Sequence, residues 1–275
     1  MNTEDTVQSI AVGDECVVVV ETSSGDAQIE GWEEARVEVE SSAKEARVQQ
    51  EGTTLHISPR PAGSGDVKVR VPQHSSVVLR SVSGDAQLSG ITGQVTIQAT
   101  SGDVKVHRLR GQLKVHTVSG DLKVRQSDLR SASIDTVSGD MEIETALHPQ
   151  GEYDVRGVSG DLKLWLPAGQ KCTIYSSSLS GHFDSDLPHE IVEQGRRNLE
   201  VRINGGGPAF HVRSTSGDLS VRAVQGLEAE EEPAPAPSFV VRETKPLPPQ
   251  PPAGAEPFAV EQQPASPVGP SAESA

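Results

Sequence analysis

The chain is poor in aromatic residues. Only 3% of its 275 residues are Phe, Trp or Tyr, although 34% are hydrophobic. A compact globule with so few aromatic rings would be unusual. A repeat structure with a narrow core of Val, Leu and Ile needs few of them, because each repeat packs mainly against its neighbours. The composition therefore favours an elongated repeat fold.

Basic residues and long apolar runs are also scarce. Lys and Arg number 24 against 39 Asp and Glu, which gives a net charge of −15. Nucleic acids and anionic membranes attract clustered basic residues, so we expect neither as a partner. No apolar run approaches 18 residues, which predicts no membrane insertion. Residues 1–5 lack the basic and apolar pattern of a signal peptide, and the expected location is the cytoplasm.

Cysteine is nearly absent. Cys16 and Cys172 lie far apart, each in a strand-like run, and two such residues form neither a disulfide framework nor a metal-binding pattern. Cysteine is among the most frequently buried residue types, so we expect two buried thiols. No cofactor is expected either.

One motif, by contrast, is abundant: Ser-Gly-Asp followed by an apolar-x-apolar triplet. It starts at Ser24, Ser64, Ser83, Ser101, Ser119, Ser138, Ser159 and Ser216, and Ser180-Gly181-His182 is a variant. From Ser64 the spacings are 19, 18, 18, 19, 21, 21 and 36 residues. We interpret the 36 residues as two repeats, and the 40 residues between Ser24 and Ser64 as two more. A fixed short period is the mark of a repeat architecture.

Each repeat contains two strand-like stretches. In one of them, Val104 and Val106 alternate with polar residues, Gly111 marks a turn, and Leu113 and Val115 alternate again. An even period keeps alternating side chains on the same face, so the apolar set stacks inside. We therefore predict an all-β fold, a parallel β-solenoid (β-helix-like) of roughly ten coils of 18–21 residues, followed by a disordered tail.

The motif itself is predicted to form the corner of each coil. Glycine reaches positive φ without a Cβ penalty, and Ser and Asp side chains hydrogen-bond nearby backbone N–H groups in turns. Stacking would also place the aspartates in one acidic ladder, partly offset by Lys105 and Lys123. The histidine of the variant motif is interpreted as sequence drift. The expected structural turn residues are Gly25, Gly65, Gly84, Gly102, Gly120, Gly139, Gly160, Gly217, Asp85, Asp103, Asp121, Asp140 and Asp161.

Three regions follow from this pattern. Residues 1–62 are expected to form an irregular, strand-rich N-terminal cap with the first coils, and residues 63–227 the regular solenoid. Residues 228–275 hold 12 of the 19 prolines and eight acidic residues, which predicts a disordered acidic, proline-rich tail. Polyproline segments bind grooves at low entropic cost, so the tail is a candidate partner-binding segment. Its candidate contact residues are Phe239, Val240, Val241, Pro246, Pro248 and Pro249.

The recurring Thr-x-Ser-Gly-Asp-apolar-x-apolar unit resembles a bacterial family of uncharacterised β-strand-repeat proteins that are often labelled adhesins. So does the entry into the repeats, Val69-Arg70-Val71-Pro72, with Ser81-Val82-Ser83-Gly84-Asp85 after it. The resemblance covers roughly residues 7–224. It implies a repeat fold, frequent association with the cell envelope and no catalytic residues.

Two chemical alternatives remain open. An aspartate ladder could bind calcium, which takes six to eight oxygen ligands, but known calcium-binding β-rolls supply aspartates at about half this spacing. Carboxylates of neighbouring coils could also act as an acid and base pair in a hydrolase or lyase. A catalytic site would break the repeat in a few places, whereas these aspartates recur at every turn.

We therefore expect a non-enzymatic structural scaffold or protein-interaction module that serves an envelope-linked process in bacteria. A protein partner is expected, with the tail as one binding segment. Two alternatives are a self-assembling filament subunit, since solenoid ends expose unpaired strand edges, and an exported adhesin that binds glycan or protein.

Overall fold

The computed structural model describes residues 6–13, 15–42, 45–60 and 65–224, which form 21 β-strands. Most strand pairs are parallel, so the expected all-β, mainly parallel architecture is confirmed. Among the described residues, no helix has the length and hydropathy of a membrane span. The tail residues 225–275, with the candidate contacts from Phe239 to Pro249, lie outside the described part of the chain.

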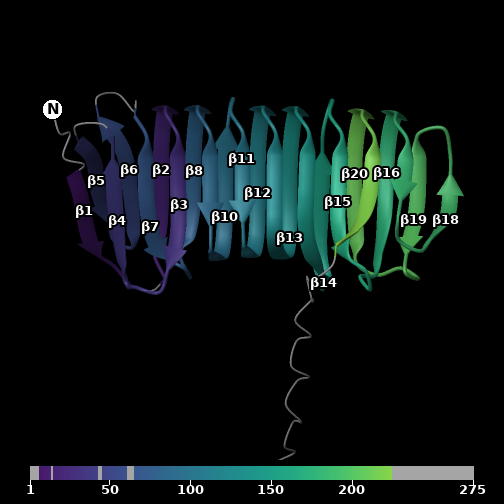
Figure 1. The fold of residues 1–275 in the computed structure, drawn as a ribbon, viewed down its shortest axis with the longest axis horizontal. Coiled ribbons are helices and arrows are strands. Elements are labelled where there is room, and N and C mark those ends of the chain that lie inside the picture. Colours follow the sequence, from purple (N-terminus) through teal and green to yellow (C-terminus); the bar gives the residue numbers. More distant parts are fainter. Residues whose placement is uncertain (1–5, 14, 43–44, 61–64, 225–275) are drawn as a thin grey trace, which may run out of the picture. The chain divides into compact units, whose positions relative to one another are not determined.

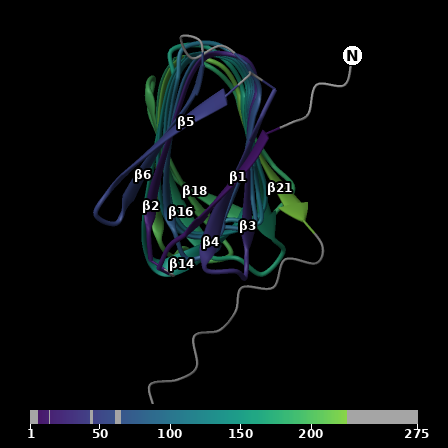
Figure 2. The same cartoon turned by 90° about the vertical axis from the view of Figure 1, so that its left-hand side faces the viewer.

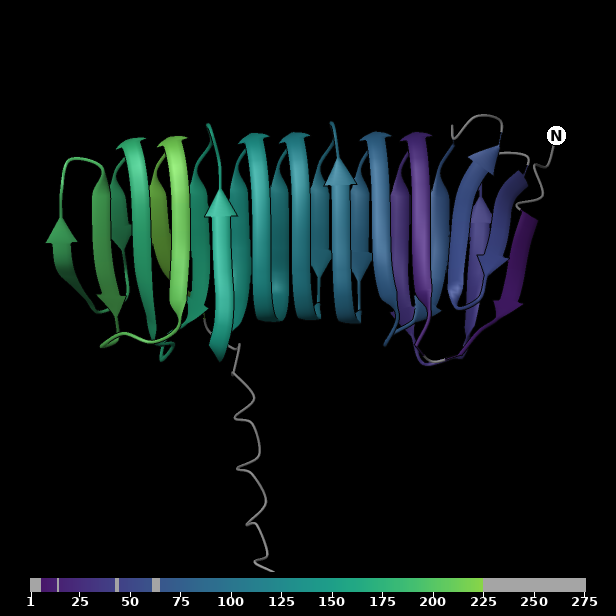
Figure 3. The same ribbon diagram turned by 180° about the vertical axis from the view of Figure 1, so that it is seen from behind.

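The strands line up side by side along the long axis of residues 6–224 (Figures 1 and 3). Viewed along that axis, they outline a flattened ring with two long sides, which we name face A and face B (Figure 2). Strands β13 (Leu122–Ser138) and β14 (Met141–Arg156) are long enough to contribute to both faces.

Face A holds the strands that lead into the Ser-Gly-Asp corners, with antiparallel strands at its two ends. In spatial order they are β5 (Glu45–Glu51), β6 (Thr54–Arg60), β2 (Val17–Ser24), β8 (Ser76–Ser83), β10 (Thr92–Ala99), β12 (Arg110–Ser119), residues 128–138 of β13, residues 152–156 of β14, β20 (Ala209–Ser216), β16 (Cys172–Ser180), β19 (Asn198–Ile203) and β18 (His189–Gln194).

Face B holds the strands that follow the corners, with the antiparallel strands β1 (Thr6–Ala11) and β4 (Arg36–Ser41) at one end. In the same direction they are β1, β4, β7 (Val67–Pro72), β3 (Ala27–Trp32), β9 (Ala86–Ser89), β11 (Val104–His107), residues 122–125 of β13, residues 141–144 of β14, β15 (Leu162–Pro167), β21 (Leu219–Val224) and β17 (Phe183–Ser185).

The 18-residue period sets the register of the central coils. In β10 and β12, Val95 lies beside Leu113 and Ile97 beside Val115, each 18 residues further along the chain. Because the period is even, the buried side chains of successive coils stay on the inner side. Their stack on face A is fully or almost fully buried: Val20, Leu79, Ile97, Val115, Ile134, Val155 and Val212.

The coils do not stack in sequence order. The coil of β2 and β3 lies between that of β6 and β7 and that of β8 and β9. At the other end, the coil of β20 and β21 lies inside that of β16 and β17. The first coil, which lies within the region expected to hold a cap and the first coils, is therefore part of the regular stack. The coil that ends at Val224 is not the terminal one.

Antiparallel strands explain the two long spacings. Between the Ser24 and Ser64 corners the chain makes β4 and β5, and between the Ser180 and Ser216 corners it makes the β18–β19 hairpin. Among the described residues of these intervals there is no second Ser-Gly-Asp corner. The reading of each interval as two repeats was wrong, and the motif and its variant supply nine corners, not roughly ten coils.

The stacked aliphatic core predicts a strong dependence on single side chains. Ile97→Ala should destabilise the fold by about 2–5 kcal/mol, because the rigid coils on either side cannot close the cavity. Val118→Ala is a matched control, since Val118 is 41% exposed on a neighbouring coil, and it should cost less than about 1 kcal/mol. Chemical denaturation measures both; equal losses would contradict this description of the core.

Candidate functional site

The Ser-Gly-Asp corners form one continuous line along the stack. The eight glycines expected at the corners have φ between 109° and 132°, and Gly181 of the variant motif has 159°. At Gly120, a Cβ would lie 2.2 Å from the carbonyl oxygen of Gly102 in the neighbouring coil. The corner therefore requires glycine for two reasons, the positive φ and the close approach of the adjacent backbone.

The aspartates of the corners connect one coil to the next. The backbone N–H of Asp121 donates to Oδ1 of Asp103 at 3.1 Å, and the N–H of Val104 donates to the carbonyl oxygen of Asp121 at 2.9 Å. Each corner is thus held by two hydrogen bonds of opposite direction. The expectation that Asp would stabilise its own turn is corrected here, since the carboxylate acts on the neighbouring coil.

We name this chain of carboxylate hydrogen bonds the aspartate ladder. It contains eight bonds of 2.8–3.1 Å between successive corners. From donor N–H to acceptor Oδ1 they are Asp26 to Asp66, Asp85 to Asp26, Asp103 to Asp85, Asp121 to Asp103, Asp140 to Asp121, Asp161 to Asp140, Asp218 to Asp161 and His182 to Asp218.

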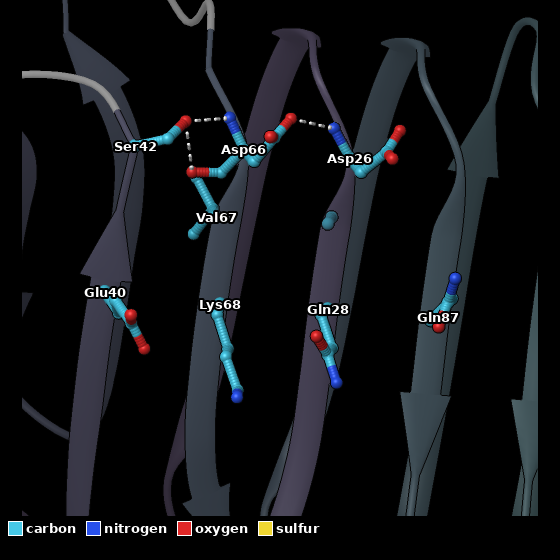
Figure 4. Close-up of a pocket in the computed structure, with 9 residues that line it drawn as sticks. Asp26, Gln28, Glu40, Ser42, Asp66, Val67, Lys68 and Gln87 are labelled. Carbon is cyan, nitrogen blue, oxygen red and sulfur yellow. Dashed lines mark hydrogen bonds between the residues drawn. The ribbon is translucent and has the colours of Figure 1, made fainter. Parts of the chain in front are cut away.

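Both ends of the ladder are closed by a different residue. At the first corner, the N–H of Asp66 donates to Oγ of Ser42 at 2.9 Å, as Figure 4 shows. At the last corner, the N–H of His182 donates to Asp218, and no further coil follows that needs an acceptor. The interpretation of His182 as sequence drift is therefore replaced by a structural one: the terminal corner needs no carboxylate.

Hydroxyl groups complete the corner. The side chain two residues before the corner serine donates to that serine's carbonyl oxygen, as Thr117 does to Ser119 and Thr136 to Ser138. Both threonine side chains are buried. The recurring Thr of the Thr-x-Ser-Gly-Asp unit is the sequence signal for these bonds.

The ladder also concentrates negative charge. Lys105 and Lys123 lie side by side in register on β11 and β13, but the structure shows no Asp–Lys ion pair at the corners of the described coils. A hollow of about 320 Å³ opens beside the first corners, lined by Asp26, Glu40, Asp66 and Lys68 among others (Figure 4). It is polar and shallow, and one carboxylate oxygen of Asp66 is already engaged in the ladder.

Groups with strongly altered acidity lie in the core, away from the corners. Burial raises the pKa of the Cys172 thiol to about 12 and that of the Tyr153 hydroxyl to about 12. Both cysteines are free and buried, and Tyr153 donates to the carbonyl oxygen of Leu129. Across the described residues, no three His, Cys, Asp or Glu side chains form a group suited to a metal ion.

The close approach of the corner glycines predicts that alanine is not tolerated at these positions. Gly120→Ala should destabilise the fold by more than about 3 kcal/mol, because the methyl group would meet backbone that cannot move without separating two coils. Gly169→Ala is the control, since a Cβ there meets nothing within 4 Å and its φ is not positive. Thermal unfolding of both variants tests this, and similar melting temperatures would contradict the close approach of the coils.

The aspartate ladder predicts a difference between two substitutions of one residue. Asp121→Ala should cost about 1 kcal/mol, because it leaves the N–H of Asp140 without its acceptor. Asp121→Asn keeps an acceptor oxygen and removes one charge from the ladder, so it should match or exceed the wild-type stability at low salt. That advantage should shrink as salt screens the repulsion. Urea unfolding at two salt concentrations measures both effects; a destabilised Asn variant would refute the proposed repulsion.

His182→Ala supplies the control at the end of the ladder. Its side chain supports no further coil, and its one contact, from Nδ1 to Oδ1 of Asp218 at 3.5 Å, is at a side chain that is 95% exposed and adds little. The variant should therefore have the unfolding midpoint of the wild type, unlike Asp121→Ala.

Comparison with solved structures finds neighbours of low sequence identity. A protein from Clostridium sporogenes, provisionally described as a cell adhesion protein, shares 12% identity over 80% of this chain and 100% of its own, with a TM-score of 0.37. Proteins provisionally described as adhesins from Parabacteroides distasonis and Bacteroides fragilis share 16% and 11% identity, with TM-scores of 0.40 and 0.41. They cover 80% and 81% of this chain, and 96% and 98% of their own.

No curated protein sequence matches the chain. A family model does, in two overlapping matches over residues 18–147 and 60–222, which together span all nine corners. The expected resemblance to the Ser-Gly-Asp repeat family is confirmed by this match, and the chain belongs to the family described as Toastrack DUF4097.

Proposed function

We propose that the protein is a non-enzymatic scaffold or protein-interaction module built as a β-solenoid. The observation that carries the proposal is the aspartate ladder. The one acidic group repeated in every regular coil already accepts a backbone hydrogen bond from the next coil. A general acid or base must be free to reach a substrate, so a carboxylate that holds two coils together is poorly placed for catalysis.

The stack supports this role through its shape and rigidity. Parallel coils fixed by corner bonds give long faces on which outward side chains recur at the strand spacing of about 4.8 Å. Repeat proteins use such extended surfaces to bind other macromolecules. The setting that we propose is an envelope-linked process in a bacterial cell, with the protein itself in the cytoplasm and a protein as its partner.

The tail is the second element of the proposal. Residues 228–275 combine acidic charge with proline-rich sequence around Phe239, Val240 and Val241. Such a segment binds a groove at low entropic cost and tethers the partner to the coil stack. The support for this part is the sequence alone.

A pull-down compares the full chain with a variant that ends at residue 227. We expect the full chain to retain a partner that the shortened variant retains weakly or loses. Phe239→Ala with Val241→Ala should reproduce the loss, whereas Pro257→Ala, outside the apolar cluster, should not. Equal recovery by all variants would place partner binding on the coils instead of the tail.

An exported adhesin is the second candidate, because the family is often given that label. It requires the protein to reach the cell surface. Cell fractionation and surface protease treatment of intact cells decide between the two: a protein that stays in the cytosolic fraction and survives the protease excludes the adhesin role, and a surface-exposed protein excludes the cytoplasmic scaffold.

A further inference from the structure

A row of exposed apolar side chains runs beside the corners on face A. We name it the valine row. Its apolar members are Val82, Val118, Val137, Val158 and Leu179, which are 41–56% exposed. They make up five of the nine large hydrophobic residues that are exposed in the described part of the chain. All five occupy the same position, immediately before the corner serine.

The row is continuous and rigid. Thr100 lies between Val82 and Val118 in the stack, and Thr215 lies between Val158 and Leu179. The carbonyl oxygen of each of four members accepts a hydrogen bond from the next coil's corner serine, at 3.0–3.1 Å: Val82 from Ser101, Thr100 from Ser119, Val137 from Ser159 and Val158 from Ser216. The backbone is thus fixed while the side chains face outward.

Folding does not explain these apolar residues. The corner bonds around the row use backbone and serine atoms, so a polar side chain at its positions would leave them intact. The next outward row on the same face is largely polar or charged, with Arg80, Gln98, His116, Asp135 and Arg156. A contiguous exposed apolar strip with a polar border is typical of an interaction surface.

The repeat distance of the side chains in the row indicates which kind of partner can contact it along its whole length. Its side chains repeat at about 4.8 Å, the distance between neighbouring strands. An α-helix offers a turn every 5.4 Å, and a strand laid along the row offers a side chain every 6.6–6.8 Å, so either would lose register within a few coils. A second copy of this chain has the same repeat and keeps register along the whole row.

We propose that two copies associate side by side through the valine row, parallel to each other, around a two-fold axis along the stack. In this arrangement each residue meets its own counterpart, Val with Val and Thr with Thr. An antiparallel pair centred on Val137 matches the row equally well, with Val82 against Leu179, Thr100 against Thr215 and Val118 against Val158. The side chains of the row therefore do not fix the orientation by themselves. The parallel pair is an isologous, closed interface.

Charge complementarity is what favours the parallel pair. The two-fold axis brings the outward row of one copy towards the corners of the other at the same level of the stack. Arg80, Arg156 and Arg213, which form ion pairs with Glu21 or Asp154 on their own face, then approach the aspartates of the partner's ladder. The antiparallel pair would instead set one ladder against the other. Glu21 and Asp135 lie in the same outward row and repel the partner's aspartates in two of the coils. The charges therefore affect the relative orientation of the two copies more than the affinity of the dimer.

The size of the surface sets the expected affinity. The seven coils from Val82 to Leu179, spaced at about 4.8 Å, give a strip of about 29 Å, and at a width of about 15 Å each copy would bury about 430 Å². That lies at the lower end for specific complexes, so we expect a weak dimer with a dissociation constant in the micromolar range.

The ends of the stack are less suited to association. The terminal strand β18 carries Glu190 and Glu193, and its register is irregular between Ile191 and Glu193, features that block strand addition at an edge. The aspartate ladder is closed at Ser42 and His182 and offers no bond to a further coil. A closed dimer therefore agrees with the structure better than a filament.

Sedimentation equilibrium of the full chain from about 1 to about 300 µM tests the proposal. We expect a monomer–dimer equilibrium. Val137→Lys should raise the dissociation constant at least tenfold, because two ammonium groups would meet at the axis. Ile191→Lys, equally exposed but at the end of the stack, should leave it unchanged, and unchanged unfolding curves should confirm that both variants fold.

A cross-linking experiment determines the orientation. Under mild oxidation with oxidised glutathione, Val118→Cys should form a disulfide-linked homodimer, since the parallel pair places residue 118 against itself, whereas an antiparallel pair centred on Val137 places it against Val158; Cys16 and Cys172 are buried and give little background. A monomer at the highest concentration, growth beyond dimers, loss of association in Ile191→Lys, or a cross-link between Val118→Cys and Val158→Cys copies that exceeds the self-link of Val118→Cys would each overturn the proposal.

Discussion

The corner hydrogen bond from an aspartate N–H to the carboxylate of the neighbouring coil constrains the rest of the structure. It requires the two backbones to approach closely, and that approach leaves no room for a Cβ at the glycine. It also fixes the coils in register, which keeps the aliphatic residues in one buried stack. Glycine, aspartate and the core are therefore three consequences of the same contact.

The same bond limits what the acidic residues can do. A carboxylate that accepts an N–H at about 2.9 Å is oriented by its neighbour, and in this chain the neighbours form an unbroken series from Asp66 to His182. Regularity that the fold requires thus argues for a structural role. The valine row recurs in five of the seven coils from Val82 to Leu179, yet folding requires no apolar residue there, so its recurrence indicates something other than folding.

The sequence predicts the local structure of a coil well and the order of the coils poorly. Alternation at Val104 and Val106 and an even period suffice to predict parallel strands, inward aliphatic side chains and glycine corners. The stacking order is different, because the corners at Gly25 and Gly84 carry the same motif and either could lie beside Gly65. A repeated motif does not identify which corner lies beside it. The repeat period therefore could not predict that the coil of β2 and β3 and the coil of β20 and β21 lie between coils that are not their neighbours in sequence.

The variant motif at His182 carries information about the order in which the coils stack. An aspartate is needed only where another coil follows, so a corner without one marks the end of the stack, even though the Ser216 corner comes later in the sequence. The chain must then turn back, and the β18–β19 hairpin returns it to the open side of β14. A terminal corner in the middle of the sequence is thus a physical signal of insertion, and the ladder that it closes favours contacts along the sides of the stack over contacts at its ends.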